Sequence, residues 1–100
     1  MSEQAPTARS RADIVTEHAS KYLQQLCKHF AHKRPASFDE RRGQISLMAG
    51  ECHLDAEGDR LVITVEAEDA AQLPQLEDVI ARHLVRFAFR EDLQIDWQRA

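Results

Sequence analysis

The spacing of apolar residues changes at Pro35, and this change constrains the fold more than any other feature of the chain. Before Pro35 the apolar residues recur every three to four positions, which is the period of an α-helix with one buried stripe. That stripe consists of Ala19, Tyr22, Leu23, Leu26 and Phe30. From Ala36 onward apolar and polar residues alternate, which is the period of a half-buried strand. The sequence therefore predicts a helix followed by several short strands.

The first helix is predicted from Thr16 to about Lys33. Thr16 is a suitable N-cap because its hydroxyl can accept a hydrogen bond from a free amide of the first turn. Pro35 cannot continue the helix. Upstream, residues 12–15 predict a short edge strand, and residues 1–11 show neither period, so we expect them to form a flexible tail.

Four short strand-like segments follow the first helix, at residues 36–38, 45–48, 52–56 and 61–65. Alternation in the third segment should point Cys52 inward and His53 outward. The fourth, Leu61–Val65, is the richest in β-branched residues and is predicted to be the central strand.

A second helix is predicted to open near Asp69 and to end near Phe87. Pro74 cannot lie inside a regular helix, so we expect either a first turn that ends at Leu73 or a kink. Residues 93–97 alternate again and predict a last strand. These elements predict a single α+β domain over residues 12–98, with two amphipathic helices on one face of an antiparallel sheet of four to six short strands.

Charge and hydropathy narrow the classes of function. The chain has 13 Lys and Arg against 17 Asp and Glu, a formal net charge of -4, which disfavours a nucleic-acid partner because phosphate binding requires clustered cations. No apolar run approaches the ~20 residues that span a bilayer, and we expect no membrane partner and a soluble, cytoplasmic protein. Cys27 and Cys52 are predicted to face the core as free thiols.

His83 is the most unusual residue of the second helix. It falls inside the apolar stripe formed by Leu73, Leu76, Ile80, Leu84 and Phe87, where an ionisable side chain requires a partner. His29 borders the stripe of the first helix. Two helices that share one core therefore each bring an imidazole toward it, and this is the main indication of a site.

Several segments of the chain resemble a known bacterial family. They are Tyr22–Phe30, Lys33, His83–Glu91 and Trp97. These segments are similar to the family called domain of unknown function 2218, over about residues 12–98. The positions that match its pattern are His29, Lys33, His83, Arg86 and Trp97. The resemblance implies no assigned activity, but some members are encoded near iron and siderophore uptake genes, which favours a metal-related ligand.

The histidines leave three alternatives: a structural role, in which each imidazole fills space and donates to a backbone carbonyl, a metal site, and an anion site. Cys27 and His29 project about 200° apart on a helix and cannot share an ion, whereas His29 and His32 can, with His83 as a third candidate ligand. Arg86 and Lys33 lie on flanks of the same helices and suit a carboxylate or phosphate.

We therefore favour a non-enzymatic binding or accessory domain. Its histidine-containing pocket would take a small anionic or metal-bound ligand through His29, Lys33, His83 and Arg86, and no particular cofactor is indicated. One alternative is a metal-dependent or proton-transfer enzyme that uses His29 and His83. A second is a homo-oligomeric module, most simply a homodimer, which would pair the open sheet faces around Met48, Val62 and Thr64.

Overall fold

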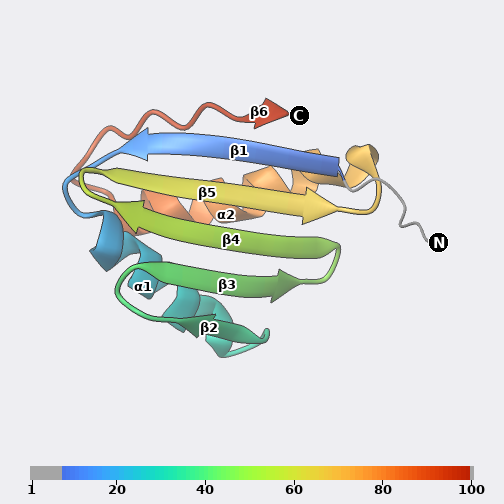
Figure 1. Cartoon of the computed structure of the whole chain (residues 1–100), viewed down its shortest axis with the longest axis horizontal. Coiled ribbons are helices and arrows are strands. Elements are labelled where there is room, and N and C mark those ends of the chain that lie inside the picture. The colour runs from blue at the N-terminus through green and yellow to red at the C-terminus, as the bar shows by residue number, and fades with distance from the viewer. Residues whose placement is uncertain (1–7, 100) are drawn as a thin grey trace.

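The computed structural model describes residues 8–99 and shows six antiparallel strands with two helices on one face of the sheet (Figure 1). The strands are β1 (Ala8–Val15), β2 (Ala36–Phe38), β3 (Arg42–Leu47), β4 (Gly50–Glu57), β5 (Arg60–Ala67) and β6 (Gln98–Arg99). The helices are α1 (Ala19–Ala31) and α2 (Leu73–Phe87). The strand order is β2-β3-β4-β5-β1-β6. The predicted α+β class, with both helices on one face of an antiparallel sheet, is confirmed.

The core lies between the helices and the inner face of the sheet. All five residues of the predicted α1 stripe are buried, and α2 buries Leu73, Leu76, Ile80 and Leu84. β5 pairs with β4 on one side and β1 on the other, so the predicted central strand is confirmed. Cys52 is fully buried while His53 is partly exposed on the other face, as the alternation predicts.

The N-terminal boundary differs from the sequence prediction. Residues 8–11, which we expected in the flexible tail, belong to β1, where Ser10 is buried and pairs with Val65 and with Arg99. This half of the strand was hard to predict because its inward residues, Ala8 and Ser10, are small or polar. Residues 1–7 of the predicted tail lie outside the described residues.

Thr16 does not cap α1 in the predicted way. The helix begins at Ala19, and its N-cap, His18, makes no side-chain capping hydrogen bond. The Thr16 hydroxyl accepts a hydrogen bond from the His18 backbone N–H at 3.1 Å and donates to the Glu91 carboxylate at 3.0 Å. With Thr16 engaged by a residue far along the chain, the N-cap lies two residues later than predicted, at His18.

A separate turn precedes α2, which is the first of the two predicted alternatives, and the helix has no kink at Pro74. Asp69 accepts a hydrogen bond from the Ala71 backbone N–H and opens a 3₁₀ turn at Ala70–Gln72. The α-helix then starts at Leu73, so Pro74 lies in its first turn, where its missing N–H breaks no helical hydrogen bond. No helix within residues 8–99 is both long and apolar enough to cross a membrane.

The predicted strand at residues 93–97 is wrong. These residues lie within the described part of the chain and form no strand, and β6 is only Gln98–Arg99, which pairs with Ser10 and Arg11. Leu93, Ile95 and Trp97 are nevertheless half-buried against the core, and the segment runs beside β1 (Figure 1). Alternation predicted the burial of the side chains, but not whether the backbone would pair.

Candidate functional site

His29 of α1 and His83 of α2 are in contact. Their ring centroids are 4.8 Å apart, with the ring planes tilted by 43°. We call this contact the imidazole pair. His83 is half-buried because it lies one turn from Ile80, on the side of α2 that faces α1, whereas His29 is exposed at the edge of its stripe. The pair is therefore open to solvent on the His29 side.

Two phenylalanines hold the imidazole pair. Phe30 lies 4.9 Å from the His83 ring and Phe87 lies 5.7 Å from the His29 ring, measured between centroids. Both belong to the predicted apolar stripes, but their spacing alone does not indicate that they contact the histidines. Such edge and tilted ring contacts favour one orientation of each imidazole.

A backbone carbonyl sets the tautomer of His83. The Nδ1 atom lies 2.6 Å from the Val79 carbonyl oxygen. A carbonyl can only accept, so Nδ1 carries the hydrogen and donates it. In the neutral ring Nε2 is then the basic nitrogen, free to accept a hydrogen bond or a proton or to bind a metal.

The charged groups that act on His29 are all cationic. Contact with neighbouring rings removes water from one side of His29, and this desolvation lowers its pKa; the charges of His83, His32, Lys33 and Arg86 lower it further. No carboxylate of the described residues is among these influences. Lys33 and Arg86 therefore make an excess of positive charge at this surface, to which the imidazoles add when they are protonated, although the whole chain carries a net charge of -4.

The lowered pKa of His29 makes a direct prediction. We expect His29 to titrate below its ordinary value of 6.5 in an NMR titration of the ring protons. Because the unfolded chain takes up this proton first, the contribution of His29 to stability should fall as pH drops from about 6.5 to the lowered pKa, and then stay constant.

The variant His83→Gln should shift the pKa of His29 back toward its ordinary value, since it removes a neighbouring charge. His53→Gln, on the opposite face of the sheet, is the matched control and should leave the titration of His29 unchanged. An unaltered His29 titration in the His83 variant would contradict the coupling between the two rings.

Other candidate ligands are not assembled around an ion. Among residues 8–99, no group of three or more His, Cys, Asp or Glu side chains is arranged to hold a metal. His32 is exposed at the C-cap of α1, and Cys27 is fully buried against the sheet, on the side of the helix away from His29. Burial raises the pKa of Cys27 to about 11 and raises that of Cys52 as well, so both thiols are protonated and unreactive at neutral pH.

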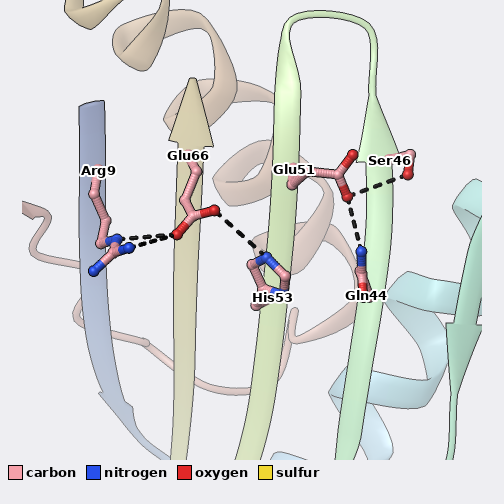
Figure 2. Close-up of polar contacts among 6 residues, drawn as sticks. All are labelled: Arg9, Gln44, Ser46, Glu51, His53 and Glu66. Carbon is pink, nitrogen blue, oxygen red and sulfur yellow. Dashed lines mark hydrogen bonds and ion pairs between the residues drawn. The ribbon is translucent and has the colours of Figure 1, made fainter. Parts of the chain in front are cut away.

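The open face of the sheet is covered by paired polar groups (Figure 2). The Glu66 carboxylate on β5 forms an ion pair with the Arg9 guanidinium on β1, at 2.9 Å. It also lies 3.7 Å from the His53 imidazole on β4. Beside them, Glu51 accepts hydrogen bonds from Gln44 and Ser46.

This face offers few apolar groups to a partner copy in the described part of the chain. Val15 is 71% exposed and Met48 is 90% exposed, but Val15 is the last residue of β1 and Met48 lies just beyond β3. Val62, within β5, is only 5% exposed. The homodimer alternative stays a prediction, and the sheet faces of the two copies would have to pair mainly through polar groups.

Sequence reasoning missed a second cluster, between the start of α1 and the residues that follow α2. The Tyr22 hydroxyl donates to Glu91, which also accepts from Thr16, and burial with this hydrogen bond raises the pKa of Tyr22 to about 12. Glu91 lies shortly after α2, inside the segment His83–Glu91 that resembles the family. That resemblance was the only feature of the sequence that could have pointed to Glu91. Gln25, one turn before His29, has a buried side-chain oxygen without a partner among the described residues.

These features define a small α+β domain with an antiparallel sheet, a covered face and an imidazole pair between its two helices. The chain belongs to the bacterial family described as "Uncharacterized protein conserved in bacteria (DUF2218)", which it matches over residues 11–98. It is similar to the NMR structure of PA4090 from Pseudomonas aeruginosa, with 36% sequence identity and a TM-score of 0.75, over 90% of this chain and 94% of that one. A comparison with curated proteins finds no match.

Proposed function

We propose that this domain binds a small anionic ligand at the surface between α1 and α2, through His29, Lys33, His83 and Arg86. The observation that carries the proposal is the group of cationic side chains around His29, which adds to desolvation in lowering the pKa of His29 and includes no carboxylate of the described residues. An anion bound there would relieve this repulsion. Binding is therefore expected to be coupled to proton uptake by His29.

Each side chain has a distinct role in this proposal. The guanidinium of Arg86 can bind a carboxylate or phosphate through two parallel hydrogen bonds, and Lys33 supplies a point charge. His83, held by the Val79 carbonyl, presents Nε2 in a fixed direction. His29 adds a second charge-assisted hydrogen bond when it is protonated.

A metal-bound anion is the finer form of the same proposal. Two imidazoles are fewer than the three protein ligands of a typical catalytic zinc site, so a metal ion would need further ligands. An anionic chelator could supply them, leaving one coordination position for Nε2 of His83. This version keeps the link to iron uptake that the family resemblance suggested.

A citrate titration followed by amide NMR tests the proposal. Citrate should perturb the amides around the imidazole pair and bind about tenfold more tightly at pH 5.5 than at pH 8, the equivalent of one charge-assisted hydrogen bond. The double variant Lys33→Gln, Arg86→Gln should weaken binding by at least that factor. Both residues are exposed, so the fold should be kept.

The matched control is the double variant Arg9→Gln, Arg11→Gln, which removes the same charge from the open face of the sheet. If this control weakens citrate binding equally, only net charge matters and the proposed site is wrong. Ferric citrate tests the metal-bound form of the proposal. If ferric citrate binds more tightly than citrate, and His83→Gln removes this difference, the metal-bound form is supported. If the two bind equally, the ligand is a simple anion.

A further inference from the structure

A hollow lies between the start of α1 and the residues that follow α2. Its volume is about 570 Å³, within the range of roughly 300–1,000 Å³ that small-molecule sites occupy. Three aromatic side chains line it: Tyr22, Phe87 and Phe89. We propose that this hollow binds a small planar aromatic carboxylate.

The aromatic walls supply the first part of the argument. Tyr22 is 4% exposed, and its hydroxyl is engaged by Glu91, so its ring is fixed in place. Phe89 is 75% exposed. Burial of a phenylalanine side chain is favourable, and no contact with the core provides that burial for Phe89. A planar ring in the hollow would cover part of Phe89 and contact the half-buried Phe87.

The charges of the rim supply the second part. His18, Lys21 and Arg90 line the hollow, and the Arg90 guanidinium lies 5.5 Å from the centroid of the Phe89 ring. A cation beside an aromatic wall suits a ligand that combines a ring with a negative charge.

Glu91 also lines the hollow, and its carboxylate must be reconciled with an anionic ligand. Its oxygens accept hydrogen bonds from Tyr22 and Thr16, and these bonds lower the pKa of Glu91, with smaller contributions from His18 and Lys21. The two positive charges of Lys21 and Arg90 leave a net charge of +1 after the single negative charge of Glu91 is counted. The excess matches a monocarboxylate better than a dianion.

This site does not rest on the proposed function of the imidazole pair. The two share only Phe87, which lines the hollow and contacts the His29 ring. Lys33, His83 and Arg86 do not line the hollow. The two sites can therefore be tested separately in the full chain.

Titration with 2-naphthoate, followed by amide NMR, tests the inference. We expect the shifts to centre on Lys21, Phe89 and Arg90. Two matched compounds separate the contributions: 2-naphthylmethanol keeps the ring without the charge, and cyclohexanecarboxylate keeps the charge without the aromatic ring. Each should bind at least fivefold more weakly than 2-naphthoate. Equal binding of either compound would overturn the class of ligand.

Variants locate the site. Phe89→Ala should weaken the binding of 2-naphthoate about fivefold, because a ring contact is lost. Arg90→Gln should weaken this binding about tenfold, because a charge-assisted hydrogen bond is lost. Met48→Ala removes another exposed apolar side chain and is the matched control.

The double variant His29→Gln, His83→Gln should leave 2-naphthoate binding unchanged. Loss of binding in this variant but not in Phe89→Ala or Arg90→Gln would place the aromatic anion at the imidazole pair and overturn the inference. Unchanged binding in all four variants would also overturn it.

Discussion

Replacing Gly50 by alanine is expected to lower the free energy of unfolding by about 3 kcal/mol, the upper end of ordinary overpacking. A Cβ atom at Gly50 would approach the Glu66 carbonyl oxygen far more closely than the 3.0 Å that real Cβ atoms keep, and it would also touch Leu76. The carbonyl belongs to the backbone of β5, which pairs with β4 at Gly50 and Ala67. It cannot rotate away, so the two strands must separate.

Gly58→Ala is the matched control for this prediction. Gly58 has a φ of +62°, and a Cβ atom there would meet nothing within 4 Å, so alanine faces only the strain of a left-handed backbone, about 1 kcal/mol. Urea unfolding of both variants measures the difference. If Gly50→Ala costs no more than Gly58→Ala, the close approach of the strands is not the cause.

The helices were predictable because their signal is local. The positions of Leu23, Leu26 and Ile80 repeat with the helical period, and no distant contact competes with that pattern. Thr16 shows the opposite case. Its residue type predicts an N-cap, but its hydroxyl also hydrogen-bonds Glu91, and a pattern read along the chain cannot anticipate a partner 75 positions away.

The candidate site was predictable only in part, for the same reason. Helix geometry alone separated Cys27 from His29, and it placed His83 among core residues. Whether the imidazoles of His29 and His83 would meet depends on how α1 and α2 cross, which no local pattern specifies. The hollow beside Phe89 was missed because its walls come from two segments that are distant in the sequence.

The spacing between α1 and the sheet depends on Gly43 of β3. A Cβ atom there would lie 2.6 Å from the Cys27 sulfur, 3.2 Å from a Leu23 methyl carbon and 3.4 Å from the Phe38 Cβ. The sulfur is buried and has little room to move. Gly43→Ala is therefore expected to destabilise the fold by about 2 kcal/mol, as an overpacked core site does, and to push α1 outward.

A double-mutant cycle with Cys27→Ala separates this clash from other effects of the substitution. Removing the sulfur alone leaves a small cavity and should cost about 1–2 kcal/mol. In the double variant the new Cβ fills part of that space, so its loss of stability should be smaller than the sum of the two single losses, with a coupling of about 1 kcal/mol. Strict additivity in urea unfolding would contradict the clash.

The same cycle reports on the candidate site, because Cys27 and His29 lie on one turn of α1. If Gly43→Ala moves the helix away from the sheet, His29 should lose part of its contact with His83, and its depressed pKa should rise toward its ordinary value. The double variant should restore the depression, which ring-proton NMR would detect. An unchanged His29 titration in Gly43→Ala, with stability lost, would mean that α1 absorbs the clash locally and that the geometry of the imidazole pair does not depend on how closely the helix packs on β3.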